Sequence, residues 1–239
     1  MERETAQADS GFYLTMAVIA AILIFLGFAP SFYMRGLIPA PVPPLSLLSA
    51  AHGITFTLWM LAFLMQIALV RWDRMRWHRE LGVLLGVLFG AVAMLALITA
   101  LVAGRLGHAP PQPEPPLVFM ALPVIGILTS IVLVTWALAR RRDGSWHKRL
   151  MLAAIFTFTG PGTGRLAIPM GLSDHMTTIS LVGSEIMLAV AIAYDWRKYG
   201  RLHPAYLAAV IVYAIGHVAI VWAYHSPTWL AFAAWVTGG

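Results

Sequence analysis

The sequence predicts an all-α fold, a polytopic membrane helix bundle of about seven transmembrane helices with the N-terminus inside and the C-terminus outside. Of the 239 residues, 60% are hydrophobic and only 11% are charged, whereas an ordinary soluble domain has about 25% charged residues. Seven apolar stretches reach the length of about 20 residues that a bilayer requires. Because they leave only short loops, we expect a single transmembrane domain.

Proline and glycine separate the seven apolar stretches, since neither residue continues a regular helix. The first stretch is longer than the apolar core of a signal peptide, so we expect it to be retained. The final segment, 226–239, is too short to cross again and is typical of an interfacial segment. We expect spans at residues 12–34, 46–70, 80–103, 117–139, 149–168, 176–194 and 204–225.

Lysine and arginine predict the orientation. Thirteen of the 16 lie at the N-terminus and in three alternate loops, and only Arg35, Arg105 and Arg165 lie on the other side. The positive-inside rule places the basic loops in the cytoplasm. Basic residues beside apolar segments suit anionic lipid, so the net charge of +6 predicts a lipid bilayer as partner and not nucleic acid. The small loops leave other membrane subunits or a second copy as the remaining partners.

Each of the three basic loops delivers a histidine to the beginning of the next helix. These are His78, His147 and His203, and a tryptophan precedes the first two. Such residues are typical of anchoring at the membrane boundary. The alternative is a ligand role, because neutral imidazole binds metal ions and haem iron. The chain has no cysteine, which excludes disulfides, iron–sulfur clusters and c-type haem.

Histidines also fall inside two apolar spans. His52 and Gln66 lie at opposite ends of one helical stripe of the second span, and His217 lies on a stripe of the seventh. An interhelical hydrogen bond of roughly 0.6 kcal/mol is one reading of an intramembrane histidine. A metal or haem ligand is the other.

The fifth and sixth spans carry ionisable groups at membrane depth. In the fifth span, the run Thr159–Gly164 should loosen or break the helix, and Arg165 follows it. The sixth span carries Glu185 near its middle, and Asp174 lies on the adjoining loop. Such residues are costly in a membrane and usually face protein, a partner or a water-filled cavity. Together with the two intramembrane histidines, they predict one polar cluster in the outer half.

Four functions fit these residues. The favoured one is a redox protein that binds haem b or a divalent metal, with His52 and His217 as outer ligands and the three loop histidines as inner ligands. The second is a small-solute or proton-coupled transporter that uses Glu185 and Arg165. The third is a lipid hydrolase with zinc held by His52, His217 and Glu185. The fourth is a non-catalytic assembly subunit.

Several short motifs carry a resemblance to a group of uncharacterised bacterial inner-membrane proteins, and it covers about residues 46–210. The chain is also distantly similar in plan to membrane cytochromes of the b561 kind, whose histidines on neighbouring helices hold haem near each membrane face. The resemblance implies a bacterial inner membrane and haem b. The chain departs from the cytochrome plan because its cytoplasmic histidines lie at helix beginnings and its fourth span has none. The motifs are His52…Trp59…Gln66, His78-Arg79…Leu81-Gly82, His147-Lys148-Arg149 and Tyr194-Asp195…His203-Pro204.

Overall fold

The computed structural model describes residues 2–39 and 44–238, and within these ranges the regular elements are helices. Six helical segments are long and apolar enough to cross a membrane. They agree with six of the seven predicted spans, and the protein is therefore a multi-pass integral membrane protein. The elements are α1 (Glu2–Phe28), η1 (Ala29–Tyr33), α2 (Leu47–Arg71), α3 (Met75–Arg105), α4 (Pro116–Phe119), α5 (Ala121–Ala139), α6 (Gly144–Thr157), α7 (Thr159–Ala167), η2 (Ser173–His175), α8 (Met176–Tyr199), α9 (Pro204–Tyr224) and α10 (Pro227–Thr237).

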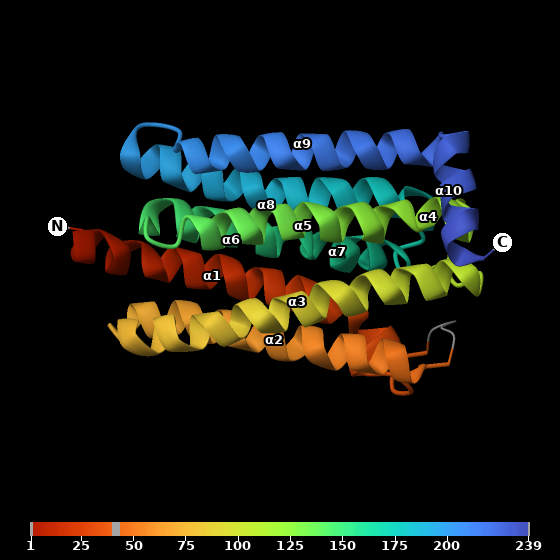
Figure 1. Cartoon of the computed structure of the whole chain (residues 1–239), viewed down its shortest axis with the longest axis horizontal. Helices are drawn as coiled ribbons and strands as arrows, with labels where there is room; N and C mark the ends of the chain where they lie inside the picture. Colours follow the sequence, from red (N-terminus) through yellow and green to blue (C-terminus); the bar gives the residue numbers. More distant parts are fainter. Residues whose placement is uncertain (1, 40–43, 239) are drawn as a thin grey trace.

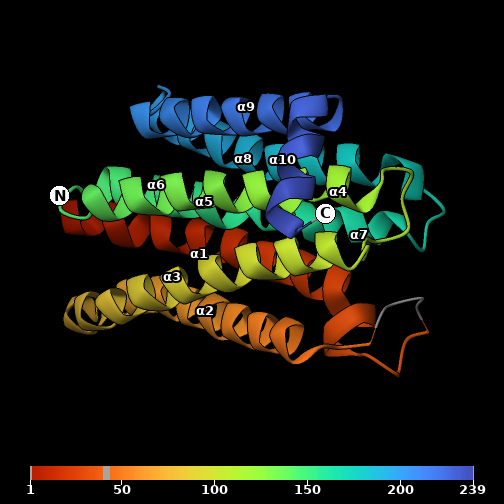
Figure 2. The same cartoon turned by 45° about the vertical axis from the view of Figure 1, so that its right-hand side comes forward.

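The helices form a bundle with one end rich in basic residues. In Figure 1 and Figure 2, α2 and α3 lie along one side, α8 and α9 along the other, and α1, α5, α6 and α7 lie between them. The N-terminus and the loops at 72–74, 140–143 and 200–203 share one end, which we call the basic end. The C-terminus lies at the opposite end, where α10 runs across the ends of the long helices. The basic loops that the sequence groups by charge are therefore neighbours in space.

Side chains at the helix beginnings satisfy main-chain N–H groups that have no partner inside the helix. Ser46 accepts a hydrogen bond from the main chain at the beginning of α2, and Asp143 accepts two at the beginning of α6. Ser226 does the same for α10. Gly200 ends α8 with a left-handed backbone (φ 68°), a conformation that favours glycine. These local signals fix where the chain turns at each end of the bundle.

The fifth predicted span, 149–168, is divided into two short helices. The interruption falls at Phe158, immediately before the run Thr159–Gly164, and that run is itself helical as the first part of α7. Pro161 is tolerated because it lies in the first turn, where its missing N–H would have no helical partner. The predicted break is therefore present, but it lies before the glycines and not within them.

The glycines of α7 allow two backbones to approach it from opposite sides. A Cβ at Gly162 would lie 2.8 Å from the main-chain oxygen of Leu23 on α1, and one at Gly160 would lie 2.7 Å from that of Ser180 on α8. Gly164 also faces Ser180. Residues two apart lie on nearly opposite faces of a helix, and residues four apart share a face. The spacing Gly-x-Gly-x-Gly therefore places α7 tightly between α1 and α8.

The glycine stripe of α3 behaves differently. Small residues at every fourth position, Gly82, Gly86 and Gly90, predict either a close-packing face or a helix surface that a flat macrocycle can approach. A Cβ at Gly82 or Gly90 would meet no atom of the described chain within 4 Å, and one at Gly86 would make only an ordinary contact with Leu138 at 3.6 Å. The prediction of close packing is wrong for the described part of the chain, and this face of α3 is open.

We expect Gly162→Ala to lower the free energy of unfolding by about 1–3 kcal/mol, because overpacking against main-chain atoms cannot be relieved by a rotamer change. Gly126 on α5 is the matched control, since a Cβ there would meet nothing within 4 Å. Gly126→Ala should leave stability unchanged or raise it slightly. Unfolding of both purified variants in detergent would measure the difference. Equal stability of the two would contradict the proposed packing of α7.

Candidate functional site

The loops before α3 and α6 bring His78 and His147 together at the basic end. Their ring centroids lie 6.3 Å apart, with ring planes at 82°. Nδ1 of His147 lies 2.9 Å from the main-chain oxygen of Ala137. A carbonyl oxygen only accepts, so Nδ1 carries the proton and Nε2 keeps its lone pair. A ring oriented in this way through one nitrogen is typical of histidines that bind a metal through the other.

Gln66 lies against His78 and belongs to this end of the bundle. With its amide nitrogen 3.0 Å from the main-chain oxygen of His78 and its oxygen 3.3 Å from the main-chain nitrogen of Gly82, Gln66 ties α2 to the first turns of α3. Nδ1 of His78 lies 2.5 Å from that amide nitrogen and 3.2 Å from the main-chain oxygen of Gln66. In this orientation Nδ1 of His78 accepts from the Gln66 amide, and it could donate to the main-chain oxygen of Gln66 only after that amide turns away.

His203 lies apart from this pair, at the beginning of α9. Its Nδ1 accepts a hydrogen bond from the main-chain N–H of Ala205 at 3.1 Å. Its Nε2 therefore carries the proton and donates to Oγ of Ser145 at 3.0 Å. Burial, together with the nearby Arg149 guanidinium, lowers the pKa of His203 and favours this neutral form. His203 thus ties α9 to α6, and its two ring nitrogens are both in use.

Arg149 and Asp195 form a buried ion pair between α6 and α8. Nε and Nη2 of Arg149 donate to one carboxylate oxygen of Asp195 at 3.1 and 2.6 Å. The two side chains are only 4% and 2% exposed. Nη1 of Arg149 donates to Oγ of Ser145 at 2.7 Å, so the guanidinium also meets the group that His203 contacts. This pair fixes the relative position of the two helices.

Asp9 on α1 makes a second charged contact beside that pair. Its carboxylate accepts hydrogen bonds from Lys148, from Lys198 at 2.5 Å and from the hydroxyl of Tyr199 at 2.5 Å. Sequence reasoning missed Asp9 and Asp195 as partners and used the basic residues only as a topology signal. The available signal was the presence of two acidic residues among so many basic ones at the same boundary, since a buried carboxylate requires a partner.

The predicted outer cluster is divided into two pairs. His52 on α2 and Arg165 on α7 both lie beside the end of the first membrane segment, since Gly53 packs against Phe32 and Arg165 lies over the ring of Phe28. Nδ1 of His217 on α9 lies 2.6 Å from the carboxylate of Glu185 on α8. In Figure 1 and Figure 2, α2 and α9 lie on opposite sides of the bundle. The four residues therefore share a level in the bundle but do not meet.

The groups proposed for zinc, His52, His217 and Glu185, consequently do not converge. Among the described side chains, those of residues 9–39 and 44–238, no three histidines, aspartates or glutamates are grouped so that they could hold a metal ion. Asp174 is exposed in η2, on the loop that leads into α8.

An aromatic cluster separates the polar groups at the two ends of α2. Its centre is Trp59, which is 1% exposed. Ring centroids of the neighbours lie between 5.3 and 6.2 Å from that of Trp59. The cluster fills the space between His52 and Gln66 along the same helix. The neighbours are Phe56, Phe63, Phe89 and Phe158.

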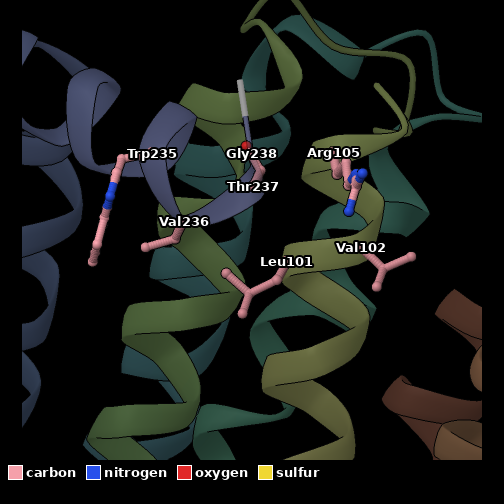
Figure 3. A pocket seen from close by; sticks show the side chains of 7 residues that line it. All are labelled: Leu101, Val102, Arg105, Trp235, Val236, Thr237 and Gly238. Atoms are coloured by element: carbon pink, nitrogen blue, oxygen red, sulfur yellow. The ribbon is translucent and has the colours of Figure 1, made fainter.

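A pocket of about 290 Å³ lies at the opposite end, between α3 and α10. Figure 3 shows Arg105 above apolar side chains, with Trp235 on the far side. Arg105 is the one charged residue among the described residues that line the pocket. The lining residues are Leu101, Val102, Arg105, Trp235, Val236, Thr237 and Gly238.

We expect Asp195→Asn to lower the free energy of unfolding by about 3–5 kcal/mol, because the charge of Arg149 would remain buried without its counterion. Glu80→Gln is the control, since it breaks the exposed pair with Arg76, whose side chains are 48% and 84% exposed. That loss should be about 0.5 kcal/mol or less. Denaturant unfolding in detergent would measure both. A small effect at Asp195 would mean that water enters the pair.

Comparison with known proteins adds no family to this description. No protein-family model matches the chain, and neither a curated protein nor a solved structure matches it significantly. The interpretation of the site therefore depends on the contacts described above. The strongest of these for ligand chemistry are the histidine pair at the basic end and the pair of His52 and Arg165.

Proposed function

We propose that this protein is a redox protein of a bacterial inner membrane that binds haem b through His78 and His147. The observation that carries the proposal is the contact between two imidazoles from the first turns of α3 and α6, with ring centroids 6.3 Å apart. His147 already has the tautomer that leaves Nε2 free. His78 would reach the same tautomer by donating from Nδ1 to the main-chain oxygen of Gln66, 3.2 Å away, once the Gln66 amide turns away from the ring. Haem iron takes its axial ligands from such histidines.

The set of donors favours haem over zinc. A zinc site takes three or four protein ligands, and no such group is present among the described residues. Haem brings its own macrocycle and needs only axial ligands from the protein. Gly82 lies one turn after His78, and the space where its Cβ would lie is open. A flat group could therefore lie against this part of α3, and a two-histidine site for a divalent metal is the remaining alternative.

The same proposal gives the protein seven membrane crossings, with the basic end in the cytoplasm. Helices α6 and α7 run on from one another and together cover residues 144–167. At 1.5 Å per residue they are about 35 Å long, enough for a hydrocarbon core of about 30 Å. Seven crossings agree with the placement of the two termini at opposite ends of the bundle. The concentration of basic loops at one end supports its cytoplasmic position.

We expect the purified protein, expressed with haem supply or reconstituted with hemin, to show a Soret band at one haem per chain. His78→Leu and His147→Leu should each abolish or strongly shift the band, because each removes one axial nitrogen. His108→Leu is the control, since His108 is exposed at the opposite end. Metal analysis of the same samples would detect a divalent ion in place of haem.

Absence of a Soret band together with absence of stoichiometric metal would refute the proposal. A Soret band that persists in both histidine variants would show that other residues supply the axial ligands. Gln66→Leu should weaken haem affinity without abolishing the spectrum, because Gln66 orients His78 and does not supply a ligand.

A second candidate function is proton-coupled transport, and the pair of Glu185 and His217 favours it. Glu185 lies near the middle of α8, yet its side chain is 53% exposed on the surface of the bundle. A carboxylate exposed at that depth is costly unless it has a function or a partner. Nδ1 of His217 lies 2.6 Å from its carboxylate. A pair of this kind can exchange a proton at membrane depth.

On this second proposal, we expect Glu185→Gln to abolish proton flux in proteoliposomes, while the elution profile of the purified protein stays unchanged. The loss follows because the amide cannot bind and release a proton. Asp174→Asn is the control, since it removes an exposed carboxylate at the end of the same hairpin. Unchanged flux in Glu185→Gln would refute transport and leave the pair as a contact for a partner subunit.

A further inference from the structure

We infer that Arg165 and His52 form a binding site for an oxyanion, of the kind carried by a phosphate group. The site lies where α1 meets α2 and α7, in the half of the bundle away from the basic end (Figure 1). It is independent of the proposed haem site, which lies at the other end of α2. The inference is therefore separable from the proposed function.

Arg165 supplies most of the donors. Its guanidinium has five N–H groups, and the described chain uses one of them, in a bond from Nη1 to the main-chain oxygen of Pro161 at 3.0 Å. The guanidinium lies 4.2 Å from the ring centroid of Phe28, whose face attracts a cation. No carboxylate of the described chain pairs with Arg165. A largely buried arginine without a counterion at this depth is costly, and a bound anion would remove that cost.

His52 supplies a second polar group to the same place. Its Nδ1 is buried and has no hydrogen-bond partner in the described chain. A buried polar nitrogen without a partner is uncommon and indicates a missing ligand or water. Gly53, the next residue, packs against the ring of Phe32, four residues after the Phe28 ring that Arg165 faces. An oxyanion beside the guanidinium would accept a hydrogen bond from the imidazole as well, so one ligand would satisfy both residues.

The surroundings limit what else could occupy the site. On the side toward the basic end, the ring of Phe56 lies 6.4 Å from that of His52 and 5.2 Å from that of Phe158. These rings close the site in that direction with apolar surface. A cation is disfavoured, because the fixed charge of Arg165 is positive and no acidic side chain pairs with it among the described residues. An anion that approaches from the end of the bundle opposite the basic end fits this arrangement.

The depth of the two residues suits a phosphate near the membrane boundary. Arg165 lies two residues before the end of α7, and His52 lies five residues after the beginning of α2. Five residues correspond to about 8 Å along a helix. This is close enough to the boundary for a lipid headgroup or for an anion that enters from the water. Both sources present the same chemistry, a phosphate that arginine binds through two parallel hydrogen bonds.

The test uses the full chain purified in detergent and follows its thermal unfolding and binding isotherms. The probes are inorganic phosphate, phosphatidylglycerol and, as the headgroup control, phosphatidylcholine. We expect an anionic probe to raise the Tm of the unmodified protein. Arg165→Gln should weaken that binding on the order of tenfold or more, and Arg165→Lys should weaken it less. Arg105→Gln removes the same charge from the same end and should bind as the unmodified protein does.

Each outcome either supports or overturns the proposed oxyanion site. Binding of inorganic phosphate that Arg165→Gln loses assigns a free anion, and binding of phosphatidylglycerol alone with the same loss assigns a lipid headgroup. No anion binding by the unmodified protein overturns the inference, as does equal binding by Arg165→Gln. If Arg165→Gln fails to fold, His52→Leu and Arg165→Lys replace it, and unchanged affinity in both overturns the inference. None of these readouts depends on haem content.

Discussion

Helix α7 packs backbone to backbone against two neighbours, and this constraint determines much of the arrangement around it. Gly162 faces α1, and Gly160 and Gly164 face α8, at distances that exclude any side chain. Only a helix with small residues on both faces can occupy such a position. The position of α7 in turn fixes Arg165, which lies one residue beyond Gly164 and cannot withdraw without moving both partner helices. The short helix is therefore the element that holds an arginine at membrane depth beside α1 and α2.

The basic end depends on a different interaction, charge pairing between helices far apart in the sequence. Lys148 and Lys198 both donate to Asp9, and Arg149 donates to Asp195. These cations contribute to the positive charge that predicts topology, yet their structural role is to join α1, α6 and α8. The same residues thus contribute to membrane orientation and to helix packing. The number of basic side chains without an acidic partner at this end is therefore smaller than the number of basic residues in the sequence suggests. The histidine pair lies on the side of this network toward α2 and α3.

Much of the fold could be predicted from the sequence, because hydropathy and charge report the position of a residue along the membrane normal. The length of each apolar segment predicts that it crosses the membrane, and the basic residues predict which loops share one end of the bundle. Which side of the bundle a residue faces is a separate question, and hydropathy gives little information about it. The sequence predicts one cluster for His52 and His217 because both lie in the outer half of their spans, but α2 and α9 lie on opposite sides of the bundle. His78 and His147 share both a level and a side. Asp9 could not be paired with Lys198 from sequence, since 189 residues separate them.

The side chains packed between the two ends of α2 determine which kind of coupling is possible between the polar groups at those ends. His52 and Gln66 are separated by 14 residues, or about 21 Å of helix, and the rings packed between them are Phe56, Trp59 and Phe63. An ion or proton that moved along this face would need polar partners, because an isolated charge in an apolar interior is costly. An electron needs no such partners. Any coupling between the His52 and Arg165 site and the histidine pair along α2 would therefore be electronic or mechanical, and proton movement would have to use the separate face of Glu185 and His217.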